Sequence, residues 1–346
     1  MTLPPDFPVE RSELVLGGSE YEEFSDYELP AHVGSTSFQK LPLVSDEELA
    51  RLAPDVAIVG APIDDGTSNR PGARFGPRAI RAATYHSGDL WSIQLETSVL
   101  DRIRAVDAGD APVVPSRLTR GLRVIHEKVW RVARTGAIPI VLGGDHSVTY
   151  PSVAAVARAR DPRKVGVVHF DAHADTGEEV WGSLVSHGTP MRRLIEEGWV
   201  EGRNFVQVGL RGYWPERETF EWMRGQGMRW HRMVEIEERG AEAVIDDAIA
   251  EALDGPELVY LSIDVDVVDP GSAPGTGTPE PGGMLPRELL RAVRRIVGSV
   301  ELAGMDVVEV APPYDHAEVT AALAHRCVLE ALSALAARRA EDGPAR

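Results

Sequence analysis

The chain has 346 residues, of which 43% are apolar and 26% charged, and its formal net charge is −18. This length and composition are typical of a globular protein with one large α/β domain or two smaller ones. The negative charge argues against a nucleic-acid or anionic-membrane partner, because no basic surplus is present to neutralise phosphates. It is compatible with a cationic substrate or with carboxylates that bind metal ions.

The only cysteine, Cys327, excludes a disulfide framework within one chain and disfavours a thiolate zinc site. The N-terminal stretch MTLPPDFPVERSEL has neither the basic nor the apolar region of a secretory signal. No run of 18 apolar residues is present, so no membrane span is expected. We therefore expect a cytoplasmic protein without a membrane or nucleic-acid partner.

In chain order, residues 1–50 are rich in Pro, Glu, Ser and Gly, which predicts an extended N-terminal arm packed on the domain or on a neighbouring subunit. Residues 51–340 are expected to form a single domain. The expected strands are 55–61, 103–109, 138–144, 165–171, 204–210, 258–264 and 305–310, with a weaker eighth at 228–233. The expected helices are 118–135, 189–198, 241–253, 286–297 and 317–340. Near-continuous apolar strands that alternate with amphipathic helices indicate a parallel sheet covered on both faces.

Polar residues concentrate just after the expected strands, where open parallel sheets bind ligands. In HFDAHADT, Asp171, His173 and Asp175 occupy every second position beyond a strand. If the chain stays extended there, all three side chains point to one side. Two further strand ends, in GGDHS and SIDVDVVDP, add Asp145, His146, Asp264 and Asp266.

Several buried carboxylates in one pocket need compensation, because repulsion and desolvation would raise their pKa values and protonate some of them. Oxygen-rich ligand sets with some imidazole suit Mn²⁺ and similar ions, whereas structural zinc sites usually contain cysteine. Six candidate ligands suit two ions that share bridging carboxylates and ionise one water near neutral pH. A single-ion site is the main alternative; a capped turn would explain one lone Asp-x-His motif. Asp64 and Asp65 are instead expected to organise the glycine-rich turn APIDDGTSNRPGARFGP.

The segments GGDHS, FDAHADT and SIDVDVVDP, in this order, resemble the three metal-binding signatures of the ureohydrolases, the family of arginase and agmatinase. GAPIDDGTSNRPGARFGPRAIR resembles that family's N-terminal signature, and SHGTPMRR and GMDVVEVAPPYDHAEVTA are more similar to agmatinase and its guanidino-acid relatives than to arginase. The resemblance covers residues 55–335. It implies an arginase-like three-layer α/β/α sandwich with a mostly parallel eight-stranded sheet, assembled as a homotrimer or homohexamer.

The resemblance also implies roles for individual residues. The implied ligands of two Mn²⁺ ions, with Ni²⁺ or Co²⁺ as alternatives, are His146 and Asp175 for one ion, His173 and Asp266 for the other, and Asp171 and Asp264 as bridges. His187 matches the family's active-site histidine, a proton shuttle or transition-state stabiliser, and Glu309 matches the glutamate that binds the guanidinium. Asp175 is the expected proton relay to the leaving amine, assisted by His187. From the residues alone, a helix-cap histidine and a structural carboxylate are the alternatives for His187 and Glu309.

The implied reaction hydrolyses a guanidino compound to urea and an amine. The loop TGEEVWGSLVS, residues 176–186, lacks the polar Asn- and Thr-rich character of the corresponding arginase segment, which argues against arginine as the substrate. Glu178 and Glu179 favour a cationic tail, unless they are only solvated loop charges. Agmatine, cleaved to putrescine and urea, is therefore the expected substrate, with Trp181 completing the substrate-binding set of His187 and Glu309.

Other substrates and other classes of protein stay open. The carboxylate of 4-guanidinobutyrate or 3-guanidinopropionate would need a cation such as Arg192, Arg193 or Arg211. Free guanidine would suit a pocket closed by Trp181 or Trp214. A formiminoglutamase is less favoured because its doubly anionic substrate suits this acidic chain poorly, and a non-catalytic paralogue because it should have lost ligands. The context of GGDHS and GTGTPEPGG argues against an unrelated two-metal phosphatase or deacetylase.

Overall fold

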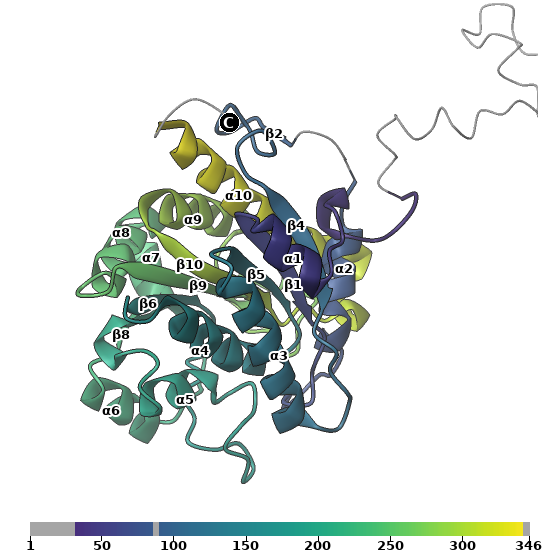
Figure 1. The fold of residues 1–346 in the computed structure, drawn as a ribbon. Coiled ribbons are helices and arrows are strands. Elements are labelled where there is room, and N and C mark those ends of the chain that lie inside the picture. Colours follow the sequence, from purple (N-terminus) through teal and green to yellow (C-terminus); the bar gives the residue numbers. More distant parts are fainter. Residues whose placement is uncertain (1–31, 86–89, 342–346) are drawn as a thin grey trace, which may run out of the picture.

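The computed structural model describes residues 32–85 and 90–341, which fold around one eight-stranded sheet (Figure 1). Its strands are β1 (Val56–Ala61), β4 (Ala105–Asp110), β5 (Ile138–Gly143), β6 (Val165–Phe170), β7 (Phe205–Leu210), β8 (Arg229–Arg232), β9 (Leu258–Asp264) and β10 (Leu302–Val308). They lie in the order β4-β1-β5-β10-β9-β6-β7-β8, and each neighbouring pair is parallel. The predicted sheet is confirmed, including the short β8. A separate antiparallel hairpin joins β2 (Trp91–Ser92) and β3 (Thr97–Ser98).

Helices cover both faces of this sheet, which confirms the predicted three-layer α/β/α sandwich (Figure 1). One face packs against α2 (Gly76–Ala82), α7 (Met233–Arg239), α8 (Ala241–Ala252), α9 (Pro286–Ser299) and α10 (Val319–Glu341). The other face packs against α1 (Asp46–Leu52), α3 (Leu118–Ala133), α4 (Thr149–Arg160), α5 (Pro190–Glu196) and α6 (Arg217–Gly225). Because both faces are covered, the central strands are apolar along nearly their whole length, whereas the edge strand β8 contains two arginines and a histidine.

Successive residues of one strand supply the two cores. In β5, Ile140 packs into the core under α9 and α10, whereas Val141 packs into the core under α3 and α4. Surface helices pack one apolar face against the sheet. For example, α3 buries Leu122, Ile125 and Val129 at helical spacing. Because the strands pair in parallel, their carboxyl ends lie at one edge of the sheet.

Helices α1, α2, α4, α6 and α7 are not among the predicted helices. The reason is clearest for α4, which is buried around most of its circumference between Thr149 and Val156. A helix enclosed on several sides carries no polar stripe, so its sequence lacks the amphipathic period that identifies surface helices. The buried hydroxyl of Thr149 donates to Asp306 of β10, one of the central strands of the sheet.

Residues 1–31 of the predicted N-terminal arm lie outside the described residues. Its remaining part packs on the domain, with Phe38 fully buried and stacked on His325, and with Asp46 of α1 paired to Lys128 of α3. The segment His316–Ala340, which contains most of α10, is long and apolar enough to cross a membrane. However, 78% of its apolar window is buried inside the fold, as in the core helix of a soluble protein, so it is weak evidence for a membrane span.

Candidate active site

The carboxyl ends of neighbouring strands bring the six predicted metal ligands together. Strands β5, β10, β9 and β6 are adjacent in the sheet, although they are far apart in the sequence. The six residues lie at three of these strand ends: His146 after β5, Asp171, His173 and Asp175 after β6, and Asp264 and Asp266 at the end of β9. The fourth strand, β10, is followed directly by Glu309.

His146 faces three carboxylates. Its Nδ1 atom lies 3.0 Å from Oδ2 of Asp171, 3.0 Å from Oδ2 of Asp175 and 3.1 Å from Oδ2 of Asp264. The ring is fully buried, and Nδ1 has no hydrogen-bond partner. One imidazole nitrogen and three carboxylate oxygens around the same point form a donor set that a divalent cation would complete.

His173 belongs to a second group of the same kind. Its Nδ1 atom lies 3.0 Å from Oδ2 of Asp266 and 3.4 Å from Oδ1 of Asp171. Asp171 therefore faces both histidines, each through a different oxygen. Backbone amides orient the carboxylates: the N–H of His173 donates to Asp171 at 2.6 Å, and that of Asp266 donates to Asp264 at 2.8 Å. The structure thus brings together the members of each implied pair, with Asp171 between the pairs.

Burial and repulsion perturb these carboxylates strongly. Burial, together with Asp266 and Asp171, raises the pKa of Asp264 well above its usual range. Burial and Asp171 likewise raise the pKa of Asp266 to about 6. Burial opposes charge on Asp171 too, but three histidines close to it, His146, His169 and His173, hold its pKa well below its usual range. A cation among these groups would relieve the repulsion, so the residues present fit a pair of divalent ions.

Glu309 and His187 form a third group beside this cluster. Glu309 is 1% exposed, and its Oε1 accepts hydrogen bonds from the backbone N–H of His146 and from Nδ1 of His187, both at 2.9 Å. Its second oxygen, Oε2, is buried without a hydrogen-bond partner. Glu309 also has a φ of 64°, a strained value for a residue with a side chain, which functional sites often retain.

His187 is placed to exchange a proton at Nε2. Burial disfavours charge on its ring, but the carboxylates of Glu309, Asp175 and Asp145 raise its pKa to about 9. Nε2 lies 2.6 Å from Oγ of Ser68 and 3.0 Å from the backbone N of the same residue. The amide favours the neutral ring, whereas the hydroxyl can accept from the charged ring. Nδ1 donates to Glu309 in either state. His187 does not cap α5, whose N-cap position is Thr189.

Other residues singled out in the sequence lie outside the cluster. Asp145 accepts hydrogen bonds from the backbone N–H groups of Gly66 and Ser147 and so holds the glycine-rich turn against β5. Within that turn, Asp64 accepts from the backbone N–H of Gly72 at 2.7 Å and pairs with Arg74, as expected for a residue that organises it.

Sequence reasoning missed His169 as a site residue. This buried histidine donates from Nε2 to Oδ2 of Asp171 at 2.9 Å, because its Nδ1 faces the amide nitrogen of Gln207 at 3.2 Å. The amide orientation of Gln207 follows from its contact with the carbonyl oxygen of Ala174, which needs a donor. The spacing that selected Asp171 and His173 extends back to His169, two residues earlier, and was the available signal.

A cavity of about 290 Å³ opens onto the cluster. Its lining includes Ser68, His173, Asp175, Val180, Trp181, His187, Gly188, Trp214, Asp264 and Thr278. These residues include carboxylates and aromatic rings but no Lys or Arg. Trp181 is 85% exposed at the tip of a two-residue turn, in which Val180 and Ser183 exchange backbone hydrogen bonds. Glu178 and Glu179 are exposed and do not line this cavity.

The arginines considered as carboxylate partners are engaged elsewhere. Arg211 donates to backbone carbonyl oxygens, among them that of Asp266 at 2.7 Å. Arg192 pairs with Glu196 at 2.8 Å and lies over the ring of Trp222, and its second carboxylate contact, Glu178, is 3.6 Å away. None of these arginine side chains, nor that of Arg193, lines the cavity.

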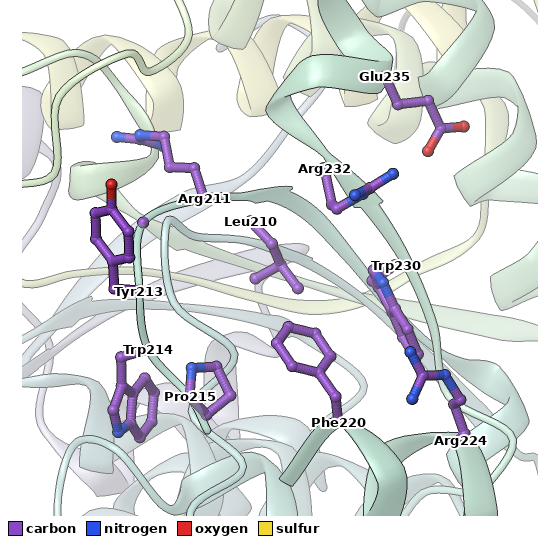
Figure 2. Close-up of a pocket in the computed structure, with 11 residues that line it drawn as sticks. Leu210, Arg211, Tyr213, Trp214, Pro215, Phe220, Arg224, Trp230, Arg232 and Glu235 are labelled. Atoms are coloured by element: carbon purple, nitrogen blue, oxygen red, sulfur yellow. The ribbon is translucent and has the colours of Figure 1, made fainter. Parts of the chain in front are cut away.

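A larger cavity of about 620 Å³ shares Trp214 with the first (Figure 2). Figure 2 shows Leu210, Phe220 and Pro215 near its centre and Arg224 beside Trp230 at one side. None of the six predicted ligands lines it. The smaller cavity is therefore the candidate active site.

Comparison with known proteins agrees with this geometry. The Arginase family profile matches residues 54–334. The chain is 42% identical over 272 residues to proclavaminate amidinohydrolase of Streptomyces clavuligerus, covering 78% of this chain and 84% of the relative. The solved structure of that enzyme superposes with a TM-score of 0.82 at 37% identity, covering 90% of this chain and 100% of that one.

Two further relatives differ in their named substrates. Guanidinopropionase of Pseudomonas aeruginosa is 41% identical over 312 residues, or 89% of this chain and 94% of the relative. The mitochondrial agmatinase of Gallus gallus is 39% identical over 308 residues, or 88% and 86%.

The fold, together with a carboxylate–histidine cluster that fits divalent cations, defines a metal-dependent type of hydrolase. The chain belongs to the arginase family. It is a ureohydrolase of guanidino compounds, in a family of metal-dependent, binuclear enzymes. The predicted family and the predicted enzymatic class are confirmed.

Proposed function

We propose that the chain is a binuclear manganese agmatinase that hydrolyses agmatine to putrescine and urea. The observation that carries the proposal is the free Oε2 atom of Glu309, a buried carboxylate oxygen without a hydrogen-bond partner beside the cluster. A guanidinium offers planar N–H donors that pair well with a carboxylate. Gly277 supports this role, because a Cβ there would lie 3.3 Å from that oxygen.

For the metal centre we propose the ligand set that the family resemblance implies. His146 and Asp175 would hold one ion, His173 and Asp266 would hold the other, and Asp171 and Asp264 would bridge them. The unpartnered Nδ1 of His146 and the repulsion among the carboxylates support two divalent cations. Mn²⁺ suits this mixture of carboxylate oxygen and imidazole nitrogen, with Ni²⁺ or Co²⁺ as alternatives.

Two bound ions would supply Lewis acidity and a water nucleophile that ionises near neutral pH. The protein then has two tasks. Glu309 orients the guanidinium so that its central carbon faces the carboxylate cluster. Pairing with the guanidinium also weakens the support that Glu309 gives to charge on His187, so the proton at Nε2 leaves more easily toward the leaving amine. Asp175, in the same cavity, relays the proton that the water gives up to the leaving amine, and His187 assists this transfer.

The lining of the cavity supports a substrate whose tail is not anionic. It contains the carboxylates of Asp175 and Asp264 and no Lys or Arg. A carboxylate tail would therefore lose its hydration without gaining a fixed cation. The amine of agmatine instead fits an aromatic mouth, and Trp181 at that mouth is the proposed tail contact.

A second candidate is hydrolysis of a guanidino acid, 4-guanidinobutyrate or 3-guanidinopropionate. The relative named guanidinopropionase is 41% identical, slightly more than the relative named agmatinase at 39%. Among the described residues no Arg or Lys lines the cavity, so a cation from elsewhere would be needed to receive the acid.

Urea release tests both candidates. The Mn²⁺-loaded protein, with a Ni²⁺-loaded sample in parallel, is offered agmatine, 4-guanidinobutyrate, 3-guanidinopropionate, arginine and free guanidine. The highest kcat/KM is expected for agmatine. A higher kcat/KM for a guanidino acid would replace the agmatinase proposal with the second candidate. If no urea is released from any of these substrates with either metal, formimino compounds become the next substrates to test.

A cytoplasmic location and assembly as a homotrimer or homohexamer stay predictions of the family resemblance. Light scattering behind size-exclusion chromatography tests the assembly. A monomer at micromolar concentration would contradict it.

A further inference from the structure

A buried network of hydroxyl groups lies behind His146, on the side away from the cavity. Nε2 of His146 is 3.1 Å from Oγ of Ser262, and that hydroxyl donates to Oδ1 of Asp306 at 2.7 Å. All three residues are fully buried. Neither Ser262 nor Asp306 lines the candidate active-site cavity, so a substrate there does not reach them.

The carboxylate of Asp306 is surrounded by donors. Its Oδ2 accepts from the hydroxyls of Thr149 and Tyr260, both at 2.9 Å, in addition to the Ser262 bond on Oδ1. A carboxylate that accepts several hydrogen bonds is stabilised in its ionised form and keeps its donors oriented. Burial raises the pKa of Asp306, and these hydroxyls oppose that effect.

The direction of these bonds determines where His146 carries its proton. Because the hydroxyl proton of Ser262 points to Asp306, its oxygen has only lone pairs to offer to His146. Nε2 of His146 must therefore be the protonated nitrogen. Nδ1, the atom that faces the three carboxylates, is then the nitrogen available to a metal ion.

We propose that Ser262 and Asp306 are positioning residues that fix the Nδ1-free tautomer and the ring orientation of His146, and thereby set the affinity for one of the two metal ions. This inference rests on the proposed metal centre. Hydrogen bonds of this kind to the second ring nitrogen orient histidine ligands and raise their basicity. Among the described residues, no protein group hydrogen-bonds to Nε2 of His173, so only His146 is oriented in this way.

The test is metal retention in Ser262→Ala. The loaded wild-type protein is expected to keep two equivalents of Mn²⁺ after dialysis against a weak chelator, and the variant one. Titration calorimetry should show an affinity for the second ion that is about 10- to 100-fold lower, the usual effect of losing such a partner. The electron paramagnetic resonance spectrum should change from that of a coupled Mn²⁺ pair to that of an isolated ion.

The matched control is Tyr260→Phe, which removes another donor to the same carboxylate but leaves the bond between Ser262 and His146 in place. It should keep both ions, and circular dichroism should show both variants folded. Two ions bound with wild-type affinity in Ser262→Ala would overturn the proposal. So would equal metal loss in Tyr260→Phe, because the network would then act only through stability. A wild-type protein that binds fewer than two ions would instead refute the proposed metal centre, and the inference with it.

Discussion

Replacing Glu309 by Gln tests the proposed guanidinium site directly. Gln keeps an oxygen for the backbone N–H of His146 and for His187, which occupy Oε1 at 2.9 Å, but it removes the charge at the free Oε2. Breaking a buried ion pair on one side costs about 3–5 kcal/mol. At about 1.4 kcal/mol per factor of ten, kcat/KM should fall by about 100- to 5,000-fold.

The assay is urea release at saturating Mn²⁺, with metal content measured on the same samples. Glu309→Gln should keep two equivalents of metal, because Glu309 is not one of the six predicted metal ligands. Glu301→Gln, in a surface pair with Arg163, serves as the control and should behave like the wild type. A loss of less than tenfold would refute guanidinium binding by Glu309, and loss of metal would place it among the ligands.

The same variant should change the pH dependence of stability. Burial disfavours charge on His187, yet Glu309 and its neighbours raise the pKa of His187 to about 9. A raised pKa stabilises the fold fully below the unfolded value of about 6.5, and this stabilisation is lost as the pH rises through about 9. Thermal unfolding of Glu309→Gln should show a smaller loss than the wild type, because only Asp175 and Asp145 still favour the charged ring. If the difference in melting temperature between pH 6 and pH 10 is the same in the variant and the wild type, Glu309 does not raise the pKa of His187.

Four further variants probe the cluster, the guanidinium pocket and the loop. Asp171→Asn and Asp264→Asn should each abolish urea release and lower bound metal, measured by elemental analysis; two full equivalents in both would refute the bridging role. Gly277→Ala places a methyl group 3.3 Å from the free glutamate oxygen, so KM should rise at least tenfold with metal content intact, and an unchanged KM would show that this space is not used. Removing Glu178 and Glu179 together should leave the substrate ranking unchanged, because neither lines the cavity; a selective loss with agmatine would restore them as amine contacts.

The sheet and the cluster were predictable from the sequence for one physical reason. Buried parallel strands are apolar runs, and the residues just beyond them must meet at one edge, so Asp171, Asp264 and His146 could be placed together without coordinates. The extended-chain argument for Asp175 was only approximate. Strand β6 ends at Phe170, and Asp175 reaches the cluster with a φ of 52° rather than as part of an extended strand.

The surrounding hydrogen bonds were not predictable in the same way. Ser262 and Thr149 have nothing in their local sequence that distinguishes them from other buried hydroxyl residues, and their role depends on contacts across 113 and 116 positions of the chain. The occupation of Arg211 by backbone carbonyls is likewise a tertiary effect. The sequence offered this arginine as a cation for the substrate, and the fold uses it to hold a loop.

The placing of one cluster at the ends of β5, β6 and β9 also has a consequence for how the protein matures. These strands come from residues 138 to 264, and β10, which lies between β5 and β9, is among the last strands of the chain. The cluster therefore does not exist until β10 has inserted and the middle of the sheet is complete. Metal uptake should therefore be a late event that reports finished folding. In a chain interrupted before β10, the acidic loops would not come together and could not bind the ions.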